Sequence, residues 1–372
     1  NYIRTPKTKT CMHKVEIRKT WISTGIIAVV IIVLHYFFSD ATFTEYNYSQ
    51  DWYVSISSGL RGISGALPFP VGDFLYAGFV LLWVVTAIDV IRAIIKKDLR
   101  MQDFWMETAY NIRKLVSIVL VFYLMWGFNY KRLGIAHQLE LTPQSYTTGE
   151  LDTLVTDLQK KVNATRQRMG DSVEYPRYEF MFTHVAEAYD ELAQQNPIFT
   201  YDNPAIKKSF YGRLGNFMGF TGYYNPFSGE ANVNIRIPKF LIPFTAAHEV
   251  AHQLGYASED EASFVAYLAA KSGQDTILKY STFFELFNYA NGELRTRDTA
   301  LARKHYEGLD TLVKADIKTY ADYVARNKSF ARSGSNFLYG IYLKANNQPA
   351  GIESYNQVTS LLIAYKRKFK NL

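Results

Sequence analysis

Three long apolar segments in the first third of the chain constrain its fold more than any other feature. Residues 21–38, WISTGIIAVVIIVLHYFF, contain no Asp, Glu, Lys or Arg, and residues 74–95 form a second apolar segment with charges only near its end. Both segments are long enough to cross the hydrocarbon layer of a bilayer as helices. We therefore expect each of them to be a transmembrane helix.

A third apolar segment, residues 115–130, is short for a span, so by length alone a buried core helix is the alternative. Trp126 and Tyr130 lie at its far end, where aromatic side chains typically anchor a helix at the membrane interface. This arrangement favours a third transmembrane helix. We therefore expect residues 21–130 to form a membrane domain.

Basic residues are distributed unevenly around these segments. Residues 1–20 carry six Lys and Arg and residues 96–114 carry five, whereas residues 39–73 carry one. Because loops rich in Lys and Arg stay in the cytoplasm, we expect residues 1–20 to be a cytoplasmic tail and residues 131–372 to lie outside. The chain does not begin with Met, and Met12 is a candidate start.

Residues 131–372 have the balanced charge of a soluble domain, with 28 Lys and Arg against 25 Asp and Glu. The basic residues form no stripe along the sequence, so we expect no nucleic-acid partner. Cys11 is the only cysteine of the chain, which excludes an intrachain disulfide framework and cysteine-based zinc sites. Any metal ion must therefore be held by His and carboxylate side chains.

A glycine-rich aromatic loop precedes a short alternating segment in this part of the chain. The loop, residues 212–230, lacks the Gly-Lys-Ser/Thr ending of a phosphate-binding loop, so it does not predict nucleotide binding. Residues 231–238, ANVNIRIP, alternate polar and apolar side chains and end at a proline, which predicts a strand. We expect it to be an edge strand with which an extended substrate pairs.

The motif His-Glu-Val-Ala-His at residues 248–252 indicates a metal-binding and catalytic site. Residues four apart share one face of a helix, so His248 and His252 can bind one zinc ion, and Glu249 can act as general base. The composition predicts only about 0.01 chance occurrences of this pattern in the chain. Gly255 follows as a signal for the end of the helix.

A catalytic zinc ion needs a third protein ligand. Ser258 stands where the long metzincin motif has its third histidine, so that group is disfavoured. The apolar side of the next predicted helix includes Glu261, whereas Glu259 points roughly opposite, so we expect Glu261 to be the ligand and Glu259 to be the second choice. The alternative is a capping box of Ser258 and Glu261, in which Glu261 only satisfies a backbone N–H group.

Several short segments spread along the chain have distinctive sequences. They are LPFPVGD at 67–73, WGFNY at 126–130, TGYYNPFSGEANVN at 221–234, AAHEVAHQLGYASEDEASF at 246–264 and NNQPAGIESY at 346–355. In these segments the chain resembles an uncharacterised bacterial family of membrane proteins, a domain of unknown function. The resemblance implies three N-terminal membrane helices and a gluzincin-like HExxH domain. Ser263 departs from the family pattern, which usually has Asn at this position.

We therefore expect a mainly α membrane protein, in which three transmembrane helices precede a mostly helical, zincin-like α+β metallopeptidase domain. One Zn²⁺ per chain is held by His248, His252 and Glu261, and Glu249 removes a proton from the attacking water. The expected partners are the bilayer of the bacterial inner membrane and an extracytoplasmic peptide or protein substrate. The candidates for stabilising the oxyanion are Tyr320, Tyr323, His305 and Arg236.

Two other classes of function remain open. A catalytically inactive, zinc-bound sensor or scaffold would keep the metal site without turnover. A transporter component is disfavoured, because the sequence lacks broken apolar segments in paired halves. The oligomeric state does not follow from the sequence.

The loop charges predict the outcome of reporter fusions. A reporter that is active only outside the cytoplasm should give signal when it is fused after Leu372 or at Ser57, and none when it is fused at Asp103. A cytoplasmic result for the fusion after Leu372 would overturn the predicted orientation.

Overall fold

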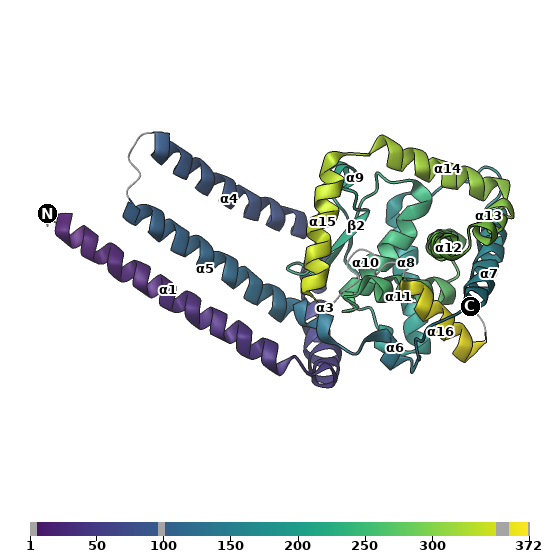
Figure 1. The fold of residues 1–372 in the computed structure, drawn as a ribbon, viewed down its shortest axis with the longest axis horizontal. Helices are drawn as coiled ribbons and strands as arrows, with labels where there is room; N and C mark the ends of the chain where they lie inside the picture. Colours follow the sequence, from purple (N-terminus) through teal and green to yellow (C-terminus); the bar gives the residue numbers. More distant parts are fainter. Residues whose placement is uncertain (1–5, 96–100, 347–356, 371–372) are drawn as a thin grey trace.

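Three long helices project from one end of a mostly helical domain (Figure 1). The structure is a computed structural model that describes residues 6–95, 101–346 and 357–370. In Figure 1 helix α1 lies along α5, whereas α4 stands apart from both. The predicted segments that fall outside the described residues are residues 1–5 of the tail, 96–100 of the cytoplasmic loop and 347–355 of the C-terminal motif.

The three long helices contain the predicted apolar segments. They are α1 (Pro6–Phe37), α4 (Val71–Ile95) and α5 (Met101–Met125). Each contains a stretch that is long and apolar enough to cross a membrane, and at most 11% of the apolar window in each is buried inside the protein. Exposed apolar surface of this extent is typical of lipid contact, so the structure supports membrane association. The stretches are Val15–Phe37, Val71–Ile95 and Phe104–Met125.

The boundaries of two segments differ from the prediction. Helix α1 already begins at Pro6, so most of the predicted tail continues the first apolar segment as one helix. Helix α5 begins at Met101 rather than at residue 115, because its first turns mix polar and apolar residues and hide the helical pattern. The third segment is therefore as long as the second, and its length no longer favours a buried core helix.

The prediction that Trp126 and Tyr130 are lipid-facing anchors is wrong. Helix α5 ends at Met125, and the chain continues as the 3₁₀-helix η2 (Gly127–Lys131) against the domain. Trp126 is only 5% exposed, and the hydroxyl of Tyr130 donates to that of Tyr342. Both aromatic side chains therefore pack within the protein.

The connection between α1 and α4 is folded and packs against the domain. It consists of α2 (Ala41–Phe43), the π-helix η1 (Thr44–Trp52) and α3 (Tyr53–Gly65). Its aromatic side chains join those of η2 in a small core that also includes Tyr224 of the domain. This aromatic core fixes the domain against the ends of the membrane helices.

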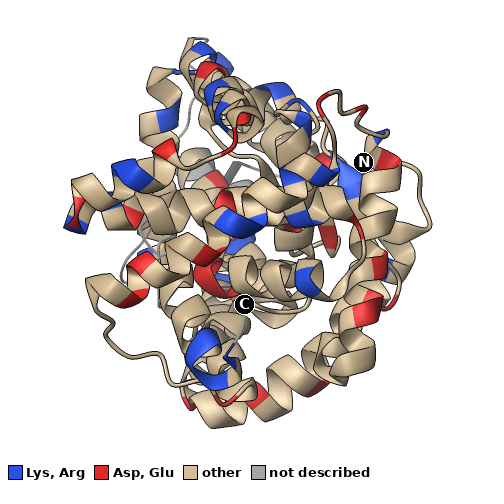
Figure 2. Ribbon diagram, turned by 90° about the vertical axis from the view of Figure 1, so that its right-hand side faces the viewer, with Lys and Arg blue, Asp and Glu red and all other residues tan. Residues whose placement is uncertain are grey.

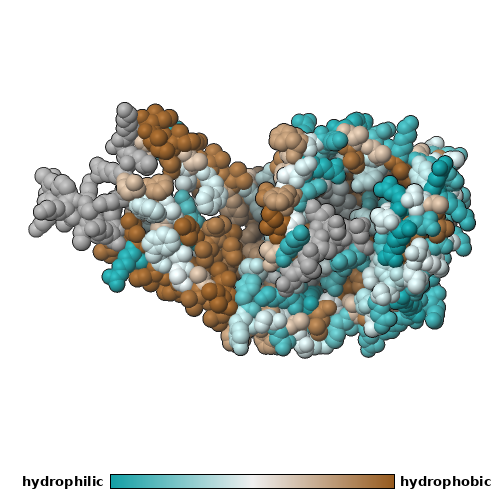
Figure 3. All heavy atoms as spheres, in the orientation of Figure 1, coloured by the Kyte–Doolittle hydropathy of each residue, from teal (hydrophilic) through white to brown (hydrophobic). Residues whose placement is uncertain are grey.

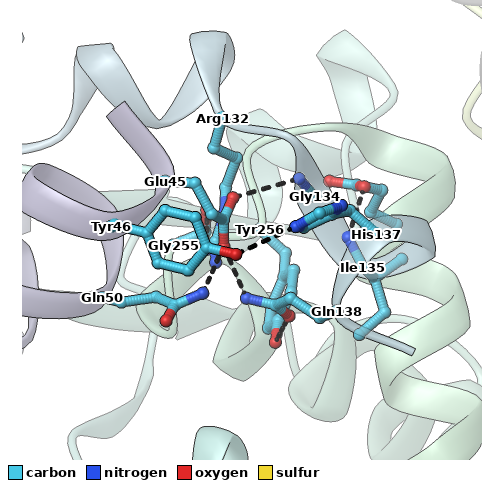
Figure 4. Close-up of polar contacts among 11 residues, drawn as sticks. Glu45, Tyr46, Gln50, Arg132, Gly134, Ile135, His137, Gln138, Gly255 and Tyr256 are labelled. Atoms are coloured by element: carbon cyan, nitrogen blue, oxygen red, sulfur yellow. Dashed lines mark hydrogen bonds and ion pairs between the residues drawn. The ribbon is translucent and has the colours of Figure 1, made fainter. Parts of the chain in front are cut away.

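A buried ion pair joins η1 to the segment that follows η2, at the junction between the long helices and the domain. The carboxylate of Glu45 in η1 accepts two hydrogen bonds from the guanidinium of Arg132, with N–O distances of 2.7 and 3.0 Å (Figure 4). It also accepts from the side chains of Gln50 and Gln138, and Arg132 donates to the carbonyl oxygen of Gly255. Burial opposes ionisation of Glu45, but Arg132 outweighs it and lowers the pKa of Glu45 to about 2.

The domain itself is a set of helices around a small sheet. Its long helices form one continuous core of buried apolar side chains. The helices are α6 (Gly134–Gln138), α7 (Thr148–Arg168), α8 (Tyr178–Gln195), η3 (Pro197–Phe199), α9 (Gly212–Met218), η4 (Lys239–Leu241), α10 (Ile242–Gln253), α11 (Glu259–Ser272), α12 (Thr276–Arg297), α13 (Thr299–Glu307), α14 (Thr311–Arg326), α15 (Phe330–Ala345) and α16 (Val358–Phe369).

The sheet corrects one prediction. Its three strands lie in the order β1 (Ile206–Lys208), β3 (Glu230–Val233) and β2 (Gly222–Asn225). The predicted strand 231–238 is therefore shorter than expected, and it is the central strand, parallel to β1 and antiparallel to β2. All four residues of β3 are buried and both of its edges are paired, so β3 is no edge strand for a substrate.

Acidic and basic side chains are interspersed on the end of the domain farthest from the membrane helices (Figure 2). Several of them form ion pairs on or near the surface, such as the pair of Arg303 and Glu307. Over the described residues this end of the domain therefore carries no extended patch of a single sign.

The buried pair at the junction predicts a large effect on stability. Glu45→Gln leaves the guanidinium of Arg132 buried without its counter-charge, and we expect a loss of about 3–5 kcal/mol in unfolding free energy. Asp51→Asn is the control, because it removes the same charge from an exposed position of the same helix. Thermal unfolding of both variants in detergent measures the difference, and equal stabilities would contradict the role of the pair.

Candidate metal centre

Helix α10 places the motif in the interior of the domain. Every residue from Ile242 to Gln253 is buried, and Pro243 occupies the first turn, where its missing N–H group costs no hydrogen bond. Gly255 follows the helix with a φ of 87°, as the sequence predicts for a helix end. A Cβ atom there would lie 2.8 Å from the ring of Tyr53, so the close approach of α3 also requires glycine.

The buried end of α10 receives hydrogen bonds from the membrane-side part of the chain. The hydroxyls of Tyr53 and Ser57 each lie 2.8 Å from the carbonyl oxygen of Gln253. The indole N–H of Trp126 donates to the carbonyl oxygen of His252 at 3.1 Å. The last carbonyl groups of a helix lack partners within the helix, so these three donors satisfy them.

The two histidines of the motif converge as their spacing predicts. His248 and His252 are both nearly buried, and their Nε2 atoms lie 3.1 Å apart. The carboxylate of Glu259, in the first turn of α11, joins them, with Oε2 at 3.0 Å from His248 Nε2 and 3.7 Å from His252 Nε2. Among the described residues, these three side chains form a group with ligand atoms close enough together to hold a metal ion.

The separations fit a tetrahedral site. Ligand atoms at zinc–ligand distances of ~2.0 Å and tetrahedral angles lie roughly 3.3 Å apart, close to the separations found here. Two imidazole nitrogens and one carboxylate oxygen would supply three of the four ligands of a tetrahedral site. The donor set therefore suits a divalent ion such as zinc.

The outer nitrogens of both histidines have partners that orient the rings. Nδ1 of His252 lies 2.7 Å from the carbonyl oxygen of Tyr256, which can only accept, so Nδ1 carries a proton and Nε2 faces the centre. Nδ1 of His248 lies 3.2 Å from the hydroxyl of Ser263. Ser263, in α11, thus contacts a candidate ligand.

A tyrosine from a distant helix completes the surroundings of Glu259. The hydroxyl of Tyr339, in α15, donates to the second carboxylate oxygen of Glu259. The sequence analysis missed this residue, because no motif distinguishes Tyr339 from the other tyrosines of the chain. Its role follows only from the packing of α15 over the centre.

Glu249 lies next to the centre without a partner for one of its oxygens. Its side chain is 5% exposed, and Oε2 has no hydrogen-bond partner. Gly222 of β2 passes close by, since a Cβ atom on it would lie 2.7 Å from Oε1 of Glu249. Burial and the nearby charge of Glu259 raise the pKa of Glu249 to about 8, although His252 opposes the shift. The pKa of this carboxyl group is therefore well above that of an exposed glutamate.

The charges of the three candidate ligands stabilise one another. Burial disfavours the carboxylate of Glu259, but its hydrogen bonds to both histidines hold its pKa well below the usual range. Burial also opposes protonation of His252, yet Glu259 raises the pKa of His252 to about 9. Burial lowers the pKa of His248. The centre therefore keeps Glu259 as an anion that is ready to bind a cation.

The structure corrects the choice of Glu261 as third ligand. Oε1 of Glu261 accepts a hydrogen bond of 2.8 Å from the backbone N–H of Ile135, at the first turn of α6 (Figure 4). Burial and the charge of Asp260 raise its pKa to about 8. The predicted capping box is also absent around this helix start, because Ser258 makes no cap hydrogen bond and bonds to Asp260 instead. The second choice, Glu259, occupies the place of the ligand.

The choice of Glu261 over Glu259 has a simple physical cause. The choice of Glu261 assumed that only one face of α11 packs inward, whereas all residues from Ala262 to Ala270 are buried. Both Glu259 and Glu261 therefore point into protein, one toward α10 and the other toward α6. Apolar periodicity cannot distinguish two faces of a helix that is buried all round.

The structure also places the candidates for oxyanion stabilisation. His305 bonds to Gln159 and Asp152 of α7, which marks it as part of the packing of that helix. The hydroxyl of Tyr323 donates to Asn216 of α9. Tyr320 packs with Tyr323 and Phe284, and Arg236 is exposed. None of the four contacts the two histidines within the described residues.

Comparison with known proteins identifies the family. A model of the family described as Protein of unknown function (DUF3810) matches residues 48–363. The chain belongs to the DUF3810 family. The matched range of this DUF3810 chain begins after α1 and includes α4, α5 and the whole centre. No curated protein and no solved structure matches it.

The two glutamates of α11 provide a matched test of the ligand set. The geometry predicts that Glu259→Gln weakens metal binding by more than the ~10–100-fold that loss of an outer partner costs. Glu261→Gln, the same change two residues along the helix, should retain the metal. Titration of each full-length variant against a chromophoric zinc chelator measures both affinities, and the reverse order would contradict the assignment of Glu259.

Proposed function

We propose that this protein is a membrane-anchored zinc metallopeptidase that hydrolyses peptide bonds of an extracytoplasmic peptide or protein. The observation that carries the proposal is the convergence of His248, His252 and Glu259 beside a buried glutamate with a free oxygen. Metallopeptidases with a His-Glu-x-x-His motif need these parts, namely three ligands and an adjacent base.

The candidate ligands suit zinc in type and number. His248, His252 and Glu259 would hold it, and Tyr256, Ser263 and Tyr339 would orient them from behind. When bound, zinc polarises a carbonyl group and lowers the pKa of water at its open position.

Glu249 performs the proton transfers of the proposed reaction. Its Oε2 has no partner, so it can accept a proton from the water that attacks the scissile carbonyl. Because Glu249 is buried beside the centre, it can hold that proton and then give it to the leaving amine. Hydrolysis thus breaks the peptide C–N bond, and the water supplies both the new C–O bond and the proton of the amine.

Strand β2 is the backbone element that we assign to the substrate. It is an outer strand of the sheet, and its Gly222 lies beside Glu249. An extended peptide that pairs with an outer strand at this position has its backbone close to the base. The glycine leaves the space that a side chain would fill.

The orientation of the domain outside the cytoplasm, in the bacterial inner membrane, rests on the basic residues of the loops. The bilayer is the partner that the exposed apolar side chains of α1, α4 and α5 require. A substrate in the same compartment is therefore an extracytoplasmic peptide or protein.

One observation favours a second function, a zinc-bound sensor or scaffold without turnover. His248, His252 and Glu249 are only 5–7% exposed, so the centre is enclosed to a degree that suits a structural role. A cleavage assay separates the two functions, because only the peptidase hydrolyses peptides.

The proposed peptidase predicts separate effects on binding and catalysis. Glu249→Gln should retain zinc while the rate of peptide hydrolysis falls by about 10²–10⁴-fold, because the base is lost and the ligands remain. Metal analysis and a library of fluorogenic peptides, applied to the full-length protein in detergent, measure the two quantities. Unchanged hydrolysis in Glu249→Gln would contradict its role, and absence of hydrolysis by the unaltered, zinc-loaded protein would favour the sensor.

A further inference from the structure

Helix α15 presents an unusually apolar surface for a helix on the outside of a domain. Phe330, Phe337, Leu338 and Ile341 are 87%, 68%, 66% and 51% exposed. At about 100° per residue, these four side chains lie within one third of the helix circumference. The opposite side of the helix contacts the protein, for example through the buried Leu343. The exposed side is therefore a continuous apolar face.

The charges of α15 differ from those of its neighbour. Among its 16 residues only Arg332 and Lys344 are charged, and both are basic. The preceding helix α14 has the same length and carries five charged residues of both signs. A helix with an apolar face, few charges and a basic bias is typical of the surface of a membrane.

The position of α15 in the fold agrees with this composition. The helix lies crosswise at the domain ends of α4 and α5 (Figure 1). Its C-terminal part contacts α5, since the ring of Tyr342 packs on Phe122 and the side chain of Asn346 accepts from the hydroxyl of Tyr123. With α5 across the bilayer, α15 therefore lies along the bilayer surface.

Exposed aromatic side chains continue the apolar surface from α4 to α15. Phe74, in the first turn of α4, contacts Phe210, and Phe217 of α9 contacts Phe330 at the start of α15. All four of these side chains are more than 40% exposed. In Figure 3 hydrophobic atoms appear on the part of the domain that adjoins the membrane helices. The lipid-facing surface of α4 thus extends onto the domain.

We propose that α15 is an interfacial helix, which buries Phe330, Phe337, Leu338 and Ile341 among the lipids of the leaflet next to the domain. The occupant of this face is the bilayer rather than a protein, because the face continues the surface of a membrane helix and lies at its end. The inference goes beyond peptide hydrolysis, since it concerns where the domain sits.

The same helix covers the candidate metal centre. Tyr339 lies between the lipid-facing residues along α15 and donates to Glu259. The bilayer surface therefore holds the helix that encloses the centre, and the centre lies directly behind the membrane interface.

Site-directed spin labelling of the full-length protein in lipid vesicles tests the proposal. Cys11→Ser removes the only cysteine, and Phe337→Cys or Ile341→Cys then takes a nitroxide label at an exposed position. Leu81→Cys, 61% exposed on α4, is the lipid reference, and Tyr306→Cys, 43% exposed on α13, is the water reference. Collision with oxygen and with a water-soluble nickel complex is measured for each label.

We expect the labels at Phe337 and Ile341 to show an oxygen-to-nickel collision ratio several-fold above that at Tyr306 and near that at Leu81. A ratio equal to that at Tyr306 would overturn the proposal, because the face would lie in water. Low collision rates with both reagents would also overturn it, because a second copy or another part of the chain would cover the face. Leu338→Cys repeats the test if one variant fails to fold, and no outcome depends on peptidase activity.

Discussion

The buried C-terminal end of α10 is the constraint on which the arrangement of the molecule depends. Carbonyl groups at a helix end must find donors, and inside a protein those donors must be side chains. Here Tyr53, Ser57 and Trp126 supply them, and all three belong to the part of the chain next to the membrane helices. The helix that carries His248 and His252 is therefore completed by the membrane region and cannot be separated from it without exposing its end.

This dependence gives the candidate centre a fixed position relative to the bilayer. The membrane region reaches the end of α10 through α3 and Trp126, while α15 reaches Glu259 through Tyr339. Both contacts come from elements at the ends of α4 and α5 (Figure 1). The candidate centre is therefore enclosed in part by elements that adjoin the apolar helices.

The sequence predicts the parts of this structure that depend on local pattern. Apolar length identifies α1 and α4, and the four-residue spacing identifies His248 and His252. The parts that depend on long-range packing are missed. The start of α5 is hidden by polar residues, Trp126 is drawn into the protein by the domain, and Glu259 is chosen over Glu261 only because α11 is buried on every side.

The ion pair of Glu45 and Arg132 links the order of assembly to the number of membrane crossings. Its partners lie 87 residues apart, on either side of α4 and α5. Two crossings would return the chain to the side on which it started, so insertion of both helices leaves the two charges on one side of the membrane, where they can meet. If either helix failed to cross, the charges would lie on opposite sides of the membrane, and the domain would lose its attachment. Insertion of one helix without the other is therefore incompatible with this ion pair.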